Sequence, residues 1–119
     1  MENWVNIFKA LAEETRFEII KLLLKDKLCV RALANHLKIT ESAISQHLKI
    51  LHQAGIVKRE KCGYYMHYSV NKNKLIEIGG KINQLAQSIP AHSPSIPLNT
   101  KEESILHHQQ QQEKEIKID

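Results

Sequence analysis

The segment 40–57 constrains what this chain can fold into more than any other part of it. Its apolar residues recur at positions i, i+4 and i+7, which places them on one face of a helix: Ile44, Leu48 and Leu51. Thr40 can cap the start of this helix, because its hydroxyl can accept a hydrogen bond from a free amide of the first turn. Gly55 marks its end, since glycine readily adopts the left-handed conformation that follows many helices. The segment therefore predicts a helix over 40–53.

The opposite face of this helix is polar. It carries two small hydroxyls, an amide and an ammonium group, on Ser42, Ser45, Gln46 and Lys49. Side chains of these kinds suit the base edges and phosphates of DNA better than a protein core. This combination of faces is typical of a DNA-recognition helix.

The residues before this helix predict the rest of a helix-turn-helix. A short helix is indicated by apolar residues at helical spacing, namely Val30, Leu33, Ala34 and Leu37. Lys38-Ile39 follows as a tight connector. Two short helices joined by a turn of three or four residues, with a polar second helix, make up the motif.

Two strand-like runs follow the recognition helix, at 57–61 and 64–70, and Cys62-Gly63 joins them. A two-residue connector that ends in glycine favours a β-hairpin. The second run alternates, so that one face is expected to hold Tyr64, Met66, Tyr68 and Val70. A hairpin in this position predicts the wing of a winged helix-turn-helix.

Further helices are predicted at both ends of the domain. The first carries Trp4, Ile7, Phe8 and Leu11, a second spans 15–24, and the last starts at Asn71 or Asn73 and carries Leu75, Ile78, Ile82 and Leu85. Gly79-Gly80 lies inside the last helix, where each glycine costs roughly 1 kcal/mol relative to alanine. Either the helix breaks there, or close backbone approach in a dimer offsets the loss. The predicted fold class is mainly α with a small β-hairpin.

Several of these segments together resemble the ArsR/SmtB family of winged-helix repressors. The run 8–23 is similar to the family's opening motif, and 28–33 resembles its third-helix element. The segments 42–51 and 54–57 are similar to its recognition helix and to the strand that follows. The similarity extends from about residue 4 to about residue 87, and several motifs in matching order are far more specific than any one of them.

Positive charge is concentrated in the part of the chain that carries these motifs. Residues 1–88 hold 14 Lys and Arg against 8 Asp and Glu, a net charge of +6, whereas residues 89–119 hold 3 against 5, a net charge of −2. Charge alone fits an ordinary basic surface equally well, but together with the motif it favours a protein that neutralises DNA phosphates.

Length and composition predict one winged helix-turn-helix domain over 1–88, followed by a low-complexity, disordered tail over 89–119. The tail contains Pro90, Pro94 and Pro97 and a run of four glutamines at 109–112, with a short helix expected around 102–114. Neither a signal-peptide pattern nor an apolar run of membrane length occurs in the sequence. The chain is therefore expected to be cytoplasmic, without a membrane partner.

Each polar residue near the recognition helix has a predicted role. Ser42, Ser45 and Gln46 are expected to face the major groove, where Gln46 can pair with adenine. Glu41 either accepts a hydrogen bond from cytosine or only complements the helix dipole. Phosphate contacts are predicted for Lys38 and Lys49, whereas Arg59 and Lys61 on the wing are expected to reach the neighbouring DNA backbone or the minor groove. His47 either bonds a phosphate or is a half-buried helix residue.

The resemblance implies a homodimer, and a helix-turn-helix usually reads a repeated half-site as a two-fold dimer. The predicted interface comprises apolar residues of the first and last helices, namely Trp4, Ile7, Phe8, Leu11, Leu75, Ile78, Ile82 and Leu85. For Trp4 and Phe8 the alternative is packing within one chain. The resemblance also implies that the residue after the wing glycine is usually arginine. Tyr64 stands there, so we expect weaker contact between wing and DNA.

The metal sites familiar in this family look absent from the sequence. The family's cysteine-pair site would need a second thiolate near Cys29, but Arg31 stands in its place, and one thiolate cannot complete the shell of a soft ion. The family's zinc site on the last helix would fall at 72–74 and 85–88, which contain no ligand. No metal cofactor is predicted.

Cys29 remains a candidate redox sensor, because a thiol at a helix start near an arginine favours the reactive thiolate. The alternative is a small buried residue. Cys62 and His67 lie an odd number of positions apart on the hairpin, so they are expected on opposite faces as a poor metal pair. The histidines of the tail, His92, His107 and His108, either bind a metal together with another site or, as is usual beside a glutamine run, are solvated.

No motif in the sequence points to an enzyme, because a glycine-rich phosphate loop, a His-Glu-x-x-His helix and a nucleophile elbow are all missing. The predicted function is a sequence-specific transcriptional repressor. It would bind a two-fold operator of double-stranded DNA as a homodimer, and an effector, where one exists, would release it. The alternative is a winged-helix protein-interaction module or antagonist that does not read DNA sequence.

Overall fold

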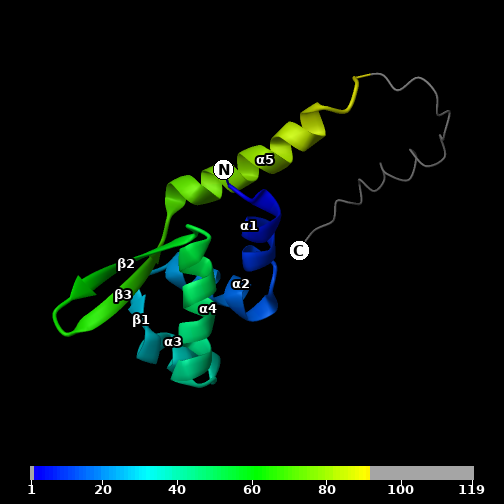
Figure 1. Cartoon of the computed structure of the whole chain (residues 1–119). Coiled ribbons are helices and arrows are strands. Elements are labelled where there is room, and N and C mark those ends of the chain that lie inside the picture. Colours follow the sequence, from blue (N-terminus) through cyan, green and yellow to red (C-terminus); the bar gives the residue numbers. More distant parts are fainter. Residues whose placement is uncertain (1, 92–119) are drawn as a thin grey trace. The chain divides into compact units, whose positions relative to one another are not determined.

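The structure is a computed structural model that describes residues 2–91. In chain order it contains α1 (Trp4–Leu11), α2 (Glu14–Leu23), β1 (Leu28–Cys29), α3 (Val30–Leu37), α4 (Glu41–Gln53), β2 (Val57–Cys62), β3 (Tyr65–Val70) and α5 (Lys72–Gln87) (Figure 1). The elements up to Ile82 form one compact unit. The rest of α5 belongs to a second unit. Most of the predicted tail, with its histidines and its short helix, lies outside the described residues.

The recognition helix α4 begins and ends where the sequence predicts. The Thr40 hydroxyl accepts a hydrogen bond of 3.0 Å from the backbone N–H of Ala43. At the other end Gly55 adopts a φ of +78°. Its N–H donates to the carbonyl of His52, and the N–H of Ile56 donates to the carbonyl of Leu51, each at 3.0 Å. These two bonds form a Schellman motif, which satisfies carbonyls that the helix leaves free.

Helix α4 also lies at the centre of the core, because it packs against α1, α2, α3 and β2. Its predicted apolar stripe, Ile44, Leu48 and Leu51, is at most 1% exposed. Three other side chains are buried as completely, namely Ile19 of α2, Leu33 of α3 and Ile56 just before β2. Full burial of such a side chain stabilises the fold by about 1.5–3 kcal/mol. The core therefore holds α4 from behind and leaves its polar face free.

The predicted turn between α3 and α4 is confirmed. Lys38 ends α3 in the left-handed conformation, with a φ of 59°, and its N–H donates to the carbonyl of Ala34 at 2.8 Å. Only the residues 38–40 separate the two helices. This is the short connection expected of a helix-turn-helix.

The predicted hairpin is present, but it belongs to a three-stranded antiparallel sheet in the order β1-β3-β2. The third strand, β1, was not predicted, because two residues are too short to show a periodic pattern. It places Leu28 opposite Tyr68 and Cys29 opposite His67. The sheet therefore joins the start of the helix-turn-helix to the base of the wing.

The predicted connector of the wing was wrong by one residue. Cys62 pairs with Tyr65, so the connecting residues are Gly63 and Tyr64. Gly63 has a φ of +66°, and positive φ at the first connecting residue is typical of a type II′ turn. Tyr64 consequently lies in the turn, 97% exposed, and does not share a strand face with Met66.

The prediction for Cys62 and His67 was also wrong. Residues directly opposite in an antiparallel pair point to the same side of the sheet. Since Cys62 is opposite Tyr65, and Tyr65 and His67 are two positions apart, Cys62 and His67 lie on the same face. The alternation of side chains cannot be counted through a two-residue turn as though the chain were straight.

Helix α5 starts after Asn71, whose side-chain oxygen accepts from the N–H of Lys74 at 3.3 Å and whose amide nitrogen donates to the carbonyl of Gly55 at 3.0 Å. The helix runs without interruption through Gly79 and Gly80. Of the two alternatives for this glycine pair, a helix break is therefore wrong. None of the helices within residues 2–91 has the length and apolarity needed to span a bilayer.

Candidate DNA-binding surface

The polar face of α4 is open to solvent. Ser42, Ser45, Gln46 and Lys49 are all exposed, on the side opposite the buried stripe. The capped first turn and the packed stripe fix the direction of this face, so these four side chains form a continuous surface on a rigid element. We call it the α4 face.

The wing lies beside the α4 face. A hollow of about 310 Å³ separates α4 from the strands and is lined by Ser45, Leu48, Lys49, His52, Gln53, Arg59 and Tyr68. It brings three predicted DNA-binding residues together, namely Ser45, Lys49 and Arg59. Sequence reasoning missed His52 and Gln53. Their spacing could have indicated them, because they follow Lys49 at i+3 and i+4 and therefore lie next to it on the surface of the helix.

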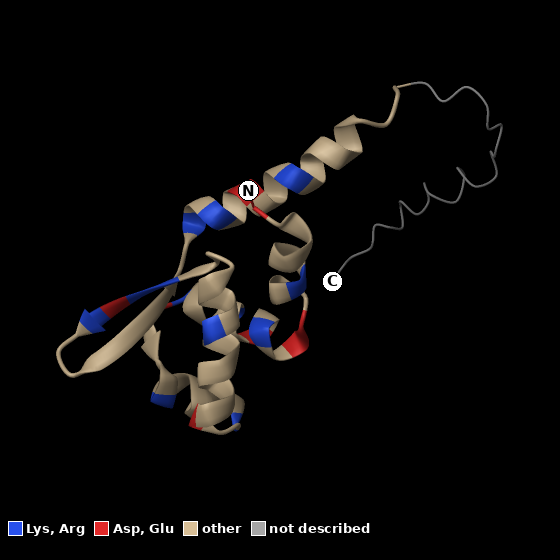
Figure 2. Cartoon of the chain, in the orientation of Figure 1, with Lys and Arg blue, Asp and Glu red and all other residues tan. Residues whose placement is uncertain are grey.

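Positive charge extends from α4 along the wing, where Figure 2 shows Lys and Arg on β2. Arg59 and Lys61 follow the buried Val57 at two-residue intervals along β2, so all three side chains lie on one face of the strand and the two exposed ones continue it outward from α4. Lys38 is exposed at the end of α3. Of these cations, Arg59 lines the hollow beside the α4 face together with Ser45 and Lys49.

Glu41 is in the first turn of α4, where a carboxylate complements the helix dipole. Its side chain lies 3.8 Å from the Nε of Arg31, and both groups are well exposed. Such a surface ion pair stabilises little. Both roles of Glu41 stay predictions.

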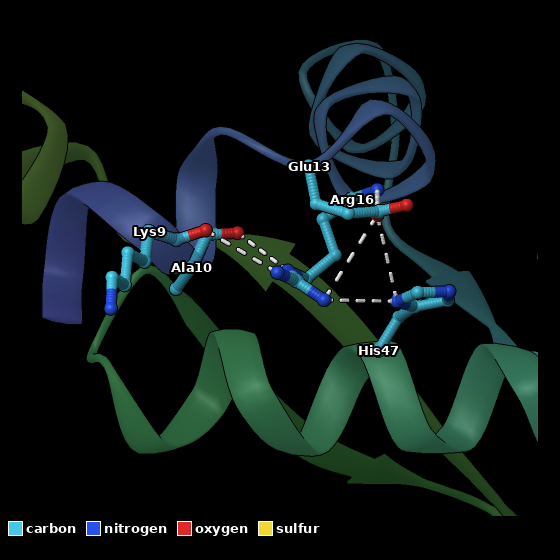
Figure 3. A network of polar contacts seen from close by, with 5 residues as sticks. All are labelled: Lys9, Ala10, Glu13, Arg16 and His47. Atoms are coloured by element: carbon cyan, nitrogen blue, oxygen red, sulfur yellow. Dashed lines mark hydrogen bonds and ion pairs between the residues drawn. The ribbon is translucent and has the colours of Figure 1, made fainter.

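His47 points toward α2, into a polar network shown in Figure 3. Its Nδ1 lies 3.3 Å from the NH1 nitrogen of Arg16 and 3.7 Å from the Oε1 oxygen of Glu13. Its side chain is 22% exposed, which agrees with the half-buried alternative. This burial leaves part of the ring accessible.

Arg16 links His47 to the end of α1. Its Nε donates to the carbonyl of Ala10 at 2.6 Å and its NH2 nitrogen donates to the carbonyl of Lys9 at 3.3 Å. Its side chain is 13% exposed. Sequence reasoning did not single out Glu13 or Arg16, because glutamate is not among the preferred N-cap residues and Glu-x-x-Arg is not a capping-box pattern. We call Glu13, Arg16 and His47 the α2–α4 network.

Glu13 caps α2 by accepting a hydrogen bond of 2.9 Å from the backbone N–H of Arg16. This bond holds the pKa of Glu13 below its ordinary value of 4.5, with smaller contributions from the Thr15 backbone N–H and from the charges of His47 and Arg16. The carboxylate therefore stays ionised to lower pH than a free glutamate.

The residues predicted for the dimer interface divide into two groups. Ile7 and Ile78 are buried in the chain's own core, and Trp4, Phe8, Leu11 and Leu75 pack partly against it. Trp4 also carries two ammonium groups over its ring, from Lys74 at 5.5 Å and Lys81 at 5.3 Å. Ile82 and Leu85, by contrast, are 53% and 65% exposed. Only this second group offers a large apolar area.

Cys29 is a half-buried free thiol at the position before α3, and its side chain makes no capping hydrogen bond. Opposite it, the Nδ1 of His67 is buried without a hydrogen-bond partner among the described residues. Cys62 is also free. It lies on β2, with β3 between it and β1, so the two Cα atoms are separated by two strand spacings of roughly 4.8 Å each. That separation exceeds the reach of a disulfide.

The described part of the chain contains no group of three or more His, Cys, Asp or Glu side chains arranged to hold a metal ion.

Comparison with known proteins points to one family. Residues 13–59, which span α2 to β2, match the model of a family described as bacterial regulatory protein, arsR family. An uncharacterized HTH-type transcriptional regulator from Methanocaldococcus jannaschii is 38% identical over 85 residues, 71% of this chain and 96% of that protein. The transcriptional repressor SdpR of Bacillus subtilis is 36% identical over 70 residues, 59% of this chain and 78% of SdpR.

A further relative acts in the opposite sense. The transcriptional activator HlyU of Vibrio cholerae is 34% identical over 71 residues, 60% of this chain and 66% of HlyU.

Solved structures agree with the sequence relatives. A possible transcriptional regulator for arsenical resistance superimposes with a TM-score of 0.62 at 31% identity, over 67% of this chain and 83% of that one. A homodimeric winged helix-turn-helix domain from Mycobacterium bovis does so with a TM-score of 0.57 at 22% identity, over 75% of this chain and 85% of that one. At that identity the second likeness concerns the fold alone.

Proposed function

Since this chain belongs to the ArsR family of bacterial transcriptional regulators, we propose that it is a repressor that reads a two-fold operator as a homodimer. The observation that carries the proposal is the α4 face, a solvent-exposed row of Ser42, Ser45, Gln46 and Lys49 on a helix fixed from behind by the core. Two such helices would enter successive major grooves about 34 Å apart.

Within this proposal the residues divide by what they touch. Ser42, Ser45 and Gln46 contact base edges, and Gln46 is suited to adenine. The cations around the α4 face contact phosphates, and they are Lys38, Lys49, Arg59 and Lys61. For His47 we favour the half-buried alternative, because its ring points toward α2 and contacts Arg16. Base contacts select the sequence, whereas phosphate contacts position the protein on any duplex.

The experiment begins with selection of duplexes from a random library by the full chain. A sequence reader should prefer its selected site over random DNA by a ratio of at least ~10³. Gln46→Ala should cost about 1–3 kcal/mol and relax the choice of base at one position of each half-site. Lys49→Ala is the matched control on the same face, because it should weaken all duplexes equally and reduce the dependence on salt.

Two outcomes would overturn the proposal. Weak, salt-labile binding without a preferred sequence would favour the alternative, a winged helix that serves as a protein-interaction module. A preferred site that Gln46→Ala leaves unchanged in sequence and affinity would instead contradict the role of α4. A reporter gene placed behind the selected site tests repression separately, and increased expression would indicate an activator such as HlyU.

Release by an effector is a further part of the proposal. An effector would favour a spacing of the two α4 helices that no longer matches the operator, with a coupling of typically 1–3 kcal/mol that must be reciprocal. Cys29 is the candidate sensing group, because it is a partly accessible free thiol at a helix start. Operator release by hydrogen peroxide should then occur in the wild type and not in Cys29→Ser. Equal release in both would exclude Cys29.

A further inference from the structure

The hollow between α4 and the wing brings basic residues together at one edge of the α4 face. Its volume is about 310 Å³, and two residues of the α4 face, Ser45 and Lys49, form part of its lining. The sheet contributes Arg59 and Tyr68. These two residues are directly opposite each other on β2 and β3, so their side chains point to the same side of the sheet. The hollow therefore joins the recognition helix to the wing.

His52 lies on the wing side of the α4 face. It follows Ser45 by seven positions, and seven helical steps of about 100° bring the two side chains within about 20° of each other around α4. It also lines the hollow. Its ring makes no hydrogen bond to another described residue, and its nitrogens are not fully buried. An accessible imidazole therefore shares the hollow with two cations.

The charge of this hollow is not neutralised by any described residue. Several cations elsewhere lie within 4.0 Å of a carboxylate, namely Arg16, Lys21, Lys27, Arg31 and Lys74. Lys49 and Arg59 have no such partner within residues 2–91, and the residues that line the hollow include no Asp or Glu. Two cations beside one small space repel each other, and an anion between them stabilises both. The hollow is therefore suited to an anion.

We propose that this hollow holds one phosphate of the DNA backbone, bound by Lys49 and His52 of α4 and by Arg59 of β2, with the Tyr68 hydroxyl as a further donor. The proposal rests on the proposed function, and it adds to it a shared phosphate and two contact residues, His52 and Tyr68. All four side chains can donate to phosphate oxygens. DNA is the expected source of the phosphate, because a helix in the major groove has a sugar–phosphate backbone on each side. The hollow lies beside α4 on the wing side, where one of these backbones would pass.

Duplexes with a neutral methylphosphonate at single positions test whether one phosphate receives these contacts. We expect one position per half-site at which the substitution weakens binding by the wild type about tenfold. At that position the loss should be clearly smaller in Lys49→Ala, in His52→Ala and in Arg59→Ala. Lys38→Ala is the matched control, because Lys38 is an exposed cation outside the hollow and its variant should lose sensitivity at a different phosphate. Separate phosphates for His52 and Arg59 would overturn the proposal.

Proton uptake on DNA binding is a readout that a structural role of His52 would not produce. The ionisable groups that line the hollow beside it are Lys49, Arg59 and Tyr68. A phosphate among them favours the charged imidazolium, and histidine is the side chain that changes charge near neutral pH. The affinity for the duplex should therefore rise several-fold from about pH 8 to about pH 6 in the wild type, and much less in His52→Gln, which does not titrate.

The matched control for this measurement is His36→Gln. His36 is an exposed histidine of α3 and does not line the hollow, so this variant should keep the rise in affinity at lower pH. His52→Arg should bind as tightly at the higher pH as the wild type does at the lower one, because arginine keeps its charge. The same pH dependence in His52→Gln as in the wild type would overturn the proposal.

Further outcomes separate this proposal from its alternatives. Saturable binding of inorganic phosphate at micromolar concentration, lost in His52→Ala, would assign the hollow to a free anion and overturn DNA as its occupant. Phosphate contacts do not depend on sequence, so the pH comparison applies to a random duplex even if no preferred site is selected. If a site is selected, and both His52→Ala and Arg59→Ala bind it with wild-type affinity, this proposal fails while base reading by α4 stands.

Discussion

Helices α4 and α5 both carry an apolar stripe, but only one of these stripes is covered within the chain. Ile44, Leu48 and Leu51 of α4 are at most 1% exposed. On α5, Ile78 is buried, whereas Ile76, Ile82 and Leu85 are more than half exposed. The difference indicates that one copy of the chain completes the DNA-reading part, while α5 has apolar area left for another surface. A second copy is the proposed occupant.

The largest expected effect tests the covered stripe. Leu48→Ala removes a side chain that is 1% exposed and is expected to destabilise the fold by about 2–5 kcal/mol, because a cavity adds to the lost burial. Denaturant unfolding measures this change. Ile50→Ala on the same helix is the control, since Ile50 is partly exposed and should cost well under half as much. Similar losses for both variants would contradict the packing of α4.

The next effect tests the uncovered stripe. Ile82→Asp should leave the folded chain intact but raise the dissociation constant of the dimer by roughly 100-fold or more, since each copy loses about 1.5–3 kcal/mol of burial. Sedimentation at several concentrations measures the constant. Leu24→Asp at the end of α2 is the control, because Leu24 is similarly exposed but lies outside the predicted interface. An unchanged dimer in Ile82→Asp would remove α5 from the interface.

A smaller effect concerns Gly80 inside α5. A Cβ added at Gly80 would meet no atom of this chain within 4 Å, so Gly80→Ala should stabilise the helix by about 0.5–1 kcal/mol. Thermal unfolding measures the gain, and Gly79→Ala serves as the comparison, because its surroundings are equally open. If either variant weakened dimerisation instead, close backbone approach between the two α5 helices would explain why glycine stands there.

The difference between α4 and α5 also explains which features of the fold could be predicted from the sequence. The stripe, cap and stop of α4 were predictable because each depends on neighbours within a few positions, as the Thr40 hydroxyl and the φ of Gly55 confirm. Burial on α5 was harder to predict. Ile78 and Ile82 share a helical face in the sequence, yet the first packs into the chain's own core and the second does not.

Contacts between distant segments were beyond sequence reasoning. The strand β1 exists only because β3 pairs with it, and two residues alone carry no strand signal. Arg16 and His47 are 31 positions apart, and their contact depends on how α2 packs against α4. The position of the wing turn depended on one pairing, Cys62 with Tyr65, which a count along the chain could not provide.

The smallest expected effect concerns Glu13, which caps α2 and lies beside Arg16 and His47. Its pKa is lowered in the folded chain, chiefly by the backbone N–H of Arg16. A lowered folded pKa means that the group stabilises the fold above its ordinary value of 4.5 and that this stabilisation is lost as the pH falls through the lower, folded value.

The effect is small because the Glu13 side chain is 40% exposed and solvent screens its charges. Denaturant unfolding between pH 6 and roughly pH 3 should therefore show a slightly steeper loss of stability for the wild type than for Glu13→Gln. Glutamine can still accept the capping bond but does not titrate, so it isolates the charge from the cap. Identical pH profiles would mean that Glu13 acts only as a helix cap and contributes nothing through its charge to the contact between α2 and α4.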